Sequence, residues 1–109
     1  MSTLSTHVLD TALGKPAAGI LVTLQQDRIV VQKAQTDADG RIPAFTDAGA
    51  LLRPGTYQLR FAVAEYWMAA GRASFYPEIV ITFMIGTDTE HYHVPLLLSP
   101  YGYTTYRGS

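Results

Sequence analysis

The chain contains three histidines, and two of them lie only two residues apart. His91 and His93 fall in a segment rich in β-forming residues, and His7 falls in a similar segment near the start of the chain. Alternate side chains of a strand share a face, so His91 and His93 are expected to point the same way. An imidazole with a pKa of about 6.5 can take a proton from water near neutrality. A lone histidine is more often structural or solvated, but two on one face favour a shared polar site.

Three histidines and one water would also suit a catalytic zinc ion. The i, i+2 spacing recurs in strands without metal, however, and no acidic residue near these positions offers an imidazole a second partner. We therefore expect neither a metal nor another cofactor. A zinc-dependent hydrolase stays open as an alternative, and activity that survives a strong chelator would exclude it.

The segment Asp37-Ala38-Asp39-Gly40 resembles a calcium-binding loop only superficially. With Gly40 at the sixth position of such a loop, the first position holds Gln35, and the twelfth holds Thr46 where a bidentate Glu is required. The segment is therefore predicted to be a turn. It places Arg41 directly after a glycine, where a guanidinium can stabilise a developing oxyanion. A solvated surface arginine is the other interpretation.

The C-terminal segment is unusual for a chain end. Tyr101, Tyr103 and Tyr106 are spaced by small residues and follow the apolar run at 94–98. Chain ends are commonly frayed. We expect this segment to be buried against another subunit, which would place the Ser109 hydroxyl and the terminal carboxylate beside ordered structure.

Short segments with a period of two dominate the chain and predict strands. One further segment, Ala64 to Ala70, is rich in Ala, Glu and Met and is followed by Gly71, which predicts a two-turn helix with a glycine cap. Seven or eight short strands with one short helix predict an all-β sandwich. The expected strands cover residues 1–9, 20–24, 29–31, 57–63, 79–85 and 91–106, and 20–24 and 29–31 form a hairpin around Gln25 to Arg28.

The composition narrows the function classes. The 109 residues fit a single domain, 1–109, and a charged fraction of 16% suggests that some apolar surface is covered by other subunits. A net charge of −1 provides no excess of positive charge for binding nucleic acid or an acidic membrane. The absence of cysteine excludes disulfides and thiol nucleophiles.

No run approaches the roughly 18 apolar residues of a membrane span. The N-terminal residues lack the features of a secretory signal, so a cytoplasmic location is expected, with a removed signal peptide left open.

Several blocks of the chain, from about Leu4 to Ser109, resemble the transthyretin-like family in the family's own order. The final tetrapeptide marks the hydrolase branch of that family, and in combination with the other blocks it is specific. The blocks are Thr6-His7-Val8-Leu9-Asp10, Gly14-Lys15-Pro16-Ala17, Thr36 to Arg41, Phe75 to Ile79, His91 to Pro100 and Tyr106-Arg107-Gly108-Ser109.

The resemblance implies a transthyretin-like β-sandwich of two four-stranded sheets with a short helix after the fifth strand. It also implies a homotetramer, a dimer of dimers, with pockets in a channel between the dimers. The implied reaction is hydrolysis of 5-hydroxyisourate to 2-oxo-4-hydroxy-4-carboxy-5-ureidoimidazoline in urate degradation, without a metal. A non-enzymatic carrier of small ligands is the alternative within the same family.

The family's catalytic positions carry over to His7, Arg41 and His93, and the terminal tetrapeptide adds Tyr106 and Ser109 to the pocket. One imidazole would activate water, while Ser109 would orient the water or a histidine. His7, Arg41 and Tyr106 would contact the substrate. His91 and Arg107 are expected to act through these residues, with His91 tuning the pKa of His93. In the carrier branch, lysine, glutamate and threonine hold the positions of His7, Arg41 and His93.

Overall fold

The computed structural model describes residues 2–45 and 52–109, so Met1 of the first expected strand and Thr46 of the calcium-loop comparison lie outside the described residues. Short strands make up most of this part of the chain, as the sequence predicts. In order, the elements are β1 (Thr3–Asp10), β2 (Lys15–Pro16), β3 (Leu21–Gln26), β4 (Ile29–Gln35), β5 (Arg41–Ile42), β6 (Gly55–Ala62), α1 (Ala64–Ala69), β7 (Ile79–Ile85), β8 (His91–Ser99) and β9 (Gly102–Thr105).

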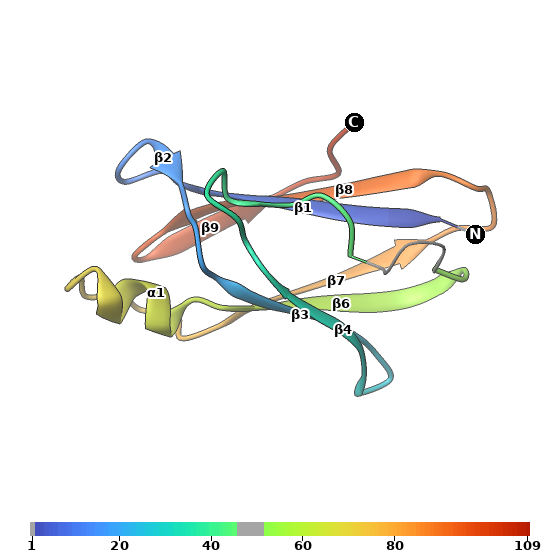
Figure 1. The fold of residues 1–109 in the computed structure, drawn as a ribbon. Coiled ribbons are helices and arrows are strands. Elements are labelled where there is room, and N and C mark those ends of the chain that lie inside the picture. The colour runs from blue at the N-terminus through green and yellow to red at the C-terminus, as the bar shows by residue number, and fades with distance from the viewer. Residues whose placement is uncertain (1, 46–51) are drawn as a thin grey trace.

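The strands form two sheets that pack face to face, as Figure 1 shows. One sheet has the order β4-β3-β6-β7, and the other has the order β2-β1-β8-β9 with β5 also paired to β1. The predicted β-sandwich with one short helix is confirmed. The second sheet has one strand more than expected, because the chain returns to β1 for two residues at β5 after the turn at 37–40. β1 and β8 pair in parallel, which aligns their side chains residue by residue.

The core lies between the two sheets. In β6 the alternation predicted from the sequence is observed, with Tyr57, Leu59 and Phe61 buried and the intervening side chains more exposed. On β1, Leu4 and Val8 are fully buried. The opposite face of β1 therefore carries Thr3, Ser5 and His7 away from the core.

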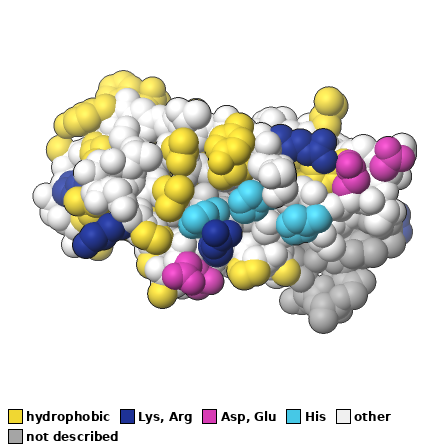
Figure 2. All heavy atoms as spheres, turned by 90° about the horizontal axis from the view of Figure 1, so that it is seen from above, with side chains coloured by type: hydrophobic (Ala, Val, Ile, Leu, Met, Phe, Trp, Pro, Cys, Tyr) yellow, Lys and Arg dark blue, Asp and Glu magenta, His cyan; other side chains and the backbone are white. Residues whose placement is uncertain are grey.

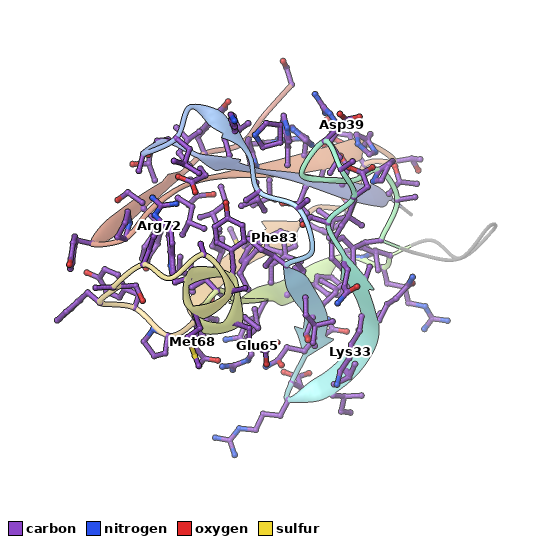
Figure 3. All side chains as sticks on the ribbon, turned by 60° about the vertical axis from the view of Figure 1, so that its left-hand side comes forward. Lys33, Asp39, Glu65, Met68, Arg72 and Phe83 are labelled. Carbon is purple, nitrogen blue, oxygen red and sulfur yellow. The ribbon has the colours of Figure 1, made fainter. Side chains whose placement is uncertain are left out.

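The helix α1 anchors one end of the sandwich. It ends at Ala69, one residue earlier than predicted, with Ala70 as its C-cap, and Gly71 follows with a φ of 65°. Trp67 is its buried residue, and the Arg72 guanidinium lies 4.7 Å from the centre of the indole ring. Arg72 also pairs with fully buried Asp10 at 2.7 Å, which ties the segment after α1 to β1 (Figure 3).

The hairpin between β3 and β4 is confirmed, but its loop is shorter than the four residues expected. Gln25 and Gln26 belong to β3, and only Asp27 and Arg28 connect the strands, with φ angles of 51° and 66°. Two central residues of positive φ are the mark of the tight turns that match the twist of a hairpin, here made without the usual Asn-Gly pair.

The C-terminal segment forms two antiparallel strands. Leu96 to Ser99 of β8 pair with Gly102 to Thr105 of β9. The remaining residues turn back across the same sheet, where Gly108 makes a bridge to His93, and the C-terminus projects from its outer side (Figure 1). In residues 2–45 and 52–109, no helix has the length and apolar character needed to cross a membrane.

Candidate active site

The parallel pairing of β1 and β8 brings the histidines to one surface. Thr3 pairs with His91, Ser5 with His93 and His7 with Pro95, so alternate residues of the two strands share the outer face of the sheet. Figure 2 shows all three imidazoles on that face, next to a basic side chain. The expected common face of His91 and His93 is therefore confirmed, and His7 lies on it as well.

The turn at 37–40, predicted from the sequence, sets the position of Arg41. The Asp37 carboxylate accepts hydrogen bonds from the backbone N–H groups of Asp39 at 2.9 Å and Arg41 at 3.0 Å. Gly40 has a φ of 74°, and its backbone lies so close to the Val8 carbonyl that any Cβ would collide with it. Only glycine fits this position. The turn is thus packed onto β1, and the backbone of Arg41 lies opposite that of His7 in the pairing of β5 with β1.

The hydrogen bond of His7 defines the tautomer of that residue. Its Nε2 lies 2.9 Å from the backbone carbonyl oxygen of Asp39, which lies beside the sheet of β1 and β8 in Figure 3. A carbonyl can only accept a hydrogen bond, so Nε2 carries the proton when the ring is neutral. The lone pair of neutral His7 is then on Nδ1.

The His93 ring is held by the hydroxyl of Ser5. Its Nδ1 lies 2.7 Å from the Ser5 hydroxyl, which also lies 2.8 Å from Nε2 of His91. The other nitrogen of His91 lies 2.6 Å from the Thr3 hydroxyl. Ser5 is buried, His93 is half-buried and His91 is exposed. These contacts leave Nε2 of His93 as the ring nitrogen that can meet a substrate.

The end of the chain lies over the same surface. The Gly108 N–H donates a hydrogen bond of 2.8 Å to the His93 carbonyl, which brings Ser109 to the rim of a pocket of about 310 Å³. The lining combines a cation, two imidazoles and hydroxyl groups. It consists of Ser5, Thr6, Arg41, Pro43, His91, His93 and Ser109.

Burial and nearby positive charge favour the neutral form of His93. Burial lowers the pKa of His93, and the positive charge of Arg41 and the neighbouring His7 and His91 lower it further. A lowered pKa means that the ring carries a lone pair over a wider range of pH. His93 is thus available as a proton acceptor beside a guanidinium that can stabilise negative charge.

Two of the residues expected at the site lie elsewhere in the single chain. Tyr106 and Arg107 line a second, mainly apolar pocket of about 250 Å³ together with residues of β7 and β8. The Arg107 guanidinium lies 4.6 Å from the centre of the Tyr92 ring, and one of its nitrogens lies 3.2 Å from the Glu90 carboxylate. The structure therefore brings Arg41, His91, His93 and Ser109 to one pocket, with His7 beside Arg41, and leaves Tyr106 and Arg107 outside it.

Sequence reasoning did not identify Ser5 or Thr3. The alternation of Thr3, Ser5 and His7 could have placed the three side chains on one face. Only the pairing of β1 with β8, however, shows that this face meets the histidines. Among the residues that the structure describes, no three His, Asp or Glu side chains converge as metal ligands would.

Comparison with known proteins identifies the family. The model of the HIUase/Transthyretin family matches residues 4–108. The chain belongs to the HIUase/Transthyretin family. Its relatives in that family include the 5-hydroxyisourate hydrolase of Mus musculus, 45% identical over 99% of this chain and 96% of the relative. The 5-hydroxyisourate hydrolase of Caulobacter vibrioides is 46% identical, and the match covers all of both chains.

Solved structures of the HIUase/Transthyretin fold agree with this assignment. The 5-hydroxyisourate hydrolase of Klebsiella pneumoniae superposes over all of both chains with a TM-score of 0.92 at 42% identity. Sea bream transthyretin in complex with thyroxine superposes with a TM-score of 0.87 at 28% identity, covering 96% of this chain and 93% of that one. The fold thus serves both a hydrolase and a ligand-bound transthyretin, so the function must be argued from the pocket residues.

Proposed function

We propose that this chain is an enzyme that hydrolyses 5-hydroxyisourate, and that the pocket on the outer face of β1 and β8 is its active site. The observation that carries the proposal is the pairing of Arg41 on β5 with His7 on β1. The strand β1 in turn pairs with β8, which carries His93. Two imidazoles and a guanidinium on one rigid sheet can hold a planar ring and activate water beside it. The 5-hydroxyisourate hydrolases among the relatives support the choice of substrate.

In the proposed reaction, His7 or His93 takes a proton from a water molecule, and the water oxygen attacks a carbonyl carbon of the ring. Negative charge develops on the carbonyl oxygen, where the Arg41 guanidinium stabilises it. The carbon–nitrogen bond of the ring then breaks, and the proton passes to the departing nitrogen. The product is 2-oxo-4-hydroxy-4-carboxy-5-ureidoimidazoline, which carries the new carboxylate and the released ureido group.

No metal takes part in this scheme, because a neutral imidazole supplies the base and the Arg41 guanidinium stabilises the oxyanion. His93 suits the role of base through its lowered pKa, and His7 suits it through the lone pair on Nδ1. General-base assistance contributes about 10² to 10⁴-fold, and a preorganised oxyanion donor about 10² to 10³-fold. Ser109 lines the pocket, where its hydroxyl orients the water or a histidine.

The assembly that we propose is a homotetramer, a dimer of dimers, with the active sites facing the channel between the dimers. The edge strands β7 and β9 support it, since Met84 and Tyr103 are 76% and 43% exposed in the single chain. Exposed apolar side chains on unpaired strand edges are commonly covered by other subunits. In the tetramer, Tyr106 lines the substrate site, whereas in the single chain it lines the apolar pocket instead. Light scattering after size-exclusion chromatography measures the mass of the assembly.

The proposed function is tested by ultraviolet absorbance after the protein is added to freshly oxidised urate. Decay of the hydroxyisourate band well above the spontaneous rate, unchanged by a strong chelator, is expected. Chiral analysis or NMR of the fresh product tests its identity. Loss of activity in the chelator with recovery on adding zinc would instead support a metal-dependent hydrolase.

A carrier of small aromatic ligands is the second candidate function. The mainly apolar pocket lined by Phe83, Met84 and Tyr106 favours it, as does the presence of a thyroxine complex among the similar structures. Decay of hydroxyisourate no faster than in buffer, by protein shown to be folded, would leave the carrier function as the better account.

A further inference from the structure

A continuous chain of hydrogen bonds links half-buried His93 with exposed His91, which lines the same pocket. It begins at Nδ1 of His93, passes through the Ser5 hydroxyl at 2.7 Å, and continues to Nε2 of His91 at 2.8 Å. Nδ1 of His91 is bound in turn to the Thr3 hydroxyl at 2.6 Å. Of these four residues, Ser5 is buried and His91 is exposed, so the chain connects a partly enclosed imidazole with a solvated one.

The protons along this chain are coupled. The Ser5 hydroxyl has one proton, so it can donate to His91 or to His93 but not to both. When Ser5 donates to His91, Nδ1 of His93 is the donor to Ser5, and Nε2 of His93 carries the lone pair. When Ser5 donates to His93, the lone pair of His93 is on Nδ1, and Nε2 carries the proton. The first arrangement is the one in which His93 can act as a base toward the pocket.

We propose that Ser5 and His91 form a proton relay for His93, with Ser5 as the positioning residue that couples the two rings. The proposal rests on the proposed hydrolase function. As Nε2 of His93 takes a proton from water, its Nδ1 proton passes to the Ser5 oxygen, and the Ser5 proton passes to Nε2 of His91. The positive charge then lies on exposed His91, and the reverse transfers return a proton through His93 to the departing ring nitrogen.

The surroundings of His93 give the relay a physical purpose. Burial and the charge of Arg41 lower the pKa of His93, so an imidazolium there is disfavoured beside the guanidinium that the reaction also needs. Transfer to His91 moves the positive charge away from Arg41 to a ring in contact with solvent. His93 therefore remains neutral before and after it accepts the proton from water.

A simpler role for Ser5 is to hold the His93 ring in place, and variants of His91 separate the two roles. His91→Gln keeps an amide that can hydrogen-bond Ser5 but cannot pass a proton, and the exposed position tolerates the change. We expect kcat to fall at least about tenfold in His91→Gln and Ser5→Ala, with KM nearly unchanged. Ser99→Ala is the matched control, because Ser99 lies at the far end of β8 and its hydroxyl donates to the Gly102 carbonyl at 3.0 Å.

Chemical rescue gives a readout that a merely structural role would not move. In His91→Ala, imidazole added to the solution should raise kcat in proportion to its concentration until it saturates, after subtraction of the rate without enzyme. The same imidazole should not rescue His93→Ala to that extent, since the reacting base is then missing. The acid limb of the kcat profile should also shift between wild type and His91→Gln.

The outcomes distinguish the relay from the function on which it rests. Wild-type protein without activity would contradict the proposed hydrolase. If the wild type is active and His91→Gln keeps the wild-type kcat, the relay is overturned, whatever the activity of Ser5→Ala. Ser5 would then only orient the His93 ring. Loss of kcat in both variants, with rescue of His91→Ala by imidazole, supports it.

Discussion

Gly108 packs directly against the imidazole ring of His93. A Cβ atom built on Gly108 would lie 2.5 Å from Cδ2 of the ring and 3.2 Å from Cγ, and the Gly108 N–H already donates to the His93 carbonyl at 2.8 Å. The ring cannot turn aside without breaking the hydrogen bond between its Nδ1 and the Ser5 hydroxyl. The terminal tetrapeptide therefore fits over the proposed base only because its third residue has no side chain.

This packing predicts that Gly108→Ala separates the chain end from His93. Displacing a catalytic group by about 1 Å can cost about 10²-fold in rate, so we expect kcat/KM to fall by at least tenfold with little change in Tm. Gly102→Ala is the control, since its Cβ would lie 3.7 Å from the Ser99 hydroxyl, an ordinary contact. Equal activity of the two variants would show that the contact with Gly108 does not position the site.

The role of Arg41 predicts that its shape matters as well as its charge. Arg41→Lys keeps a positive charge at the pocket but loses the planar, forked guanidinium. We expect kcat/KM to fall by about 10² to 10³-fold, the range for loss of an oxyanion donor, while the unfolding curve stays close to that of wild type. Stopped-flow absorbance measures the rate, and full activity in Arg41→Lys would reduce Arg41 to a general electrostatic role.

The lowered pKa of His93 predicts the pH range of activity. Burial and the positive charge of Arg41 hold this pKa below the usual 6.5, so the neutral ring persists as the pH falls through that value. kcat/KM is therefore expected to decline only below about pH 6.5.

Removing the charge in Arg41→Met should raise the pKa of His93, because a positive neighbour disfavours the imidazolium. NMR titration of the His93 ring protons measures the shift. Lys33→Met, on β4 in the other sheet (Figure 3), should leave the titration unchanged. An unchanged titration in Arg41→Met would contradict the electrostatic account of the site.

The ion pair between Arg72 and Asp10 predicts a stability effect far from the pocket. Asp10 is fully buried and accepts hydrogen bonds from Arg72 at 2.7 Å and Tyr66 at 2.8 Å. Removal of one partner from a buried pair costs about 3 to 5 kcal/mol, so Arg72→Met should lower the free energy of unfolding by about 3 kcal/mol. Urea titration at fixed protein concentration measures it, and Arg60→Met, whose partner Glu78 is exposed, should cost under about 1 kcal/mol.

The same pair gives the stability a dependence on pH. Burial alone would raise the pKa of Asp10, but the hydrogen bonds from Arg72, Tyr66 and the backbone lower it overall. A depressed carboxyl pKa contributes stability that is present above the unfolded value of about 3.9 and is lost as the pH falls through the lower folded value. Arg72→Met should therefore flatten the loss of stability on acidification, whereas an unchanged acid limb would contradict this origin.

The fold was predictable from the sequence because local patterns determine its elements. The alternation in β6, the glycine after α1 and the turn before Arg41 all express preferences of a few neighbouring residues. The short loop at Asp27 and Arg28 was not predictable, since Arg is not typical of the positive φ that the second position of this turn requires. The two-residue strand β5 was also missed, because it depends on how closely Gly40 approaches β1.

The candidate site was predictable only in part for a similar reason. His91 and His93 share a face by alternation alone, but the contact of Ser5 with both depends on the parallel register of β1 and β8. No local pattern specifies that register. The separation of Tyr106 from Ser109 into two pockets likewise follows from the path of the chain after β9.

The most direct test of the central claim compares hydroxyisourate decay in variants of the two pockets. Wild type keeps both pockets, His93→Asn and Arg41→Met alter the polar pocket, and Met84→Ala alters the apolar one. The four proteins are compared at equal mass of the assembly, measured by light scattering. The account predicts rapid decay with wild type and Met84→Ala. It predicts that the decay rate falls by at least about 10²-fold in His93→Asn and Arg41→Met. Full activity in His93→Asn and Arg41→Met, with loss in Met84→Ala, would contradict the assignment of the active site to the outer face of β1 and β8.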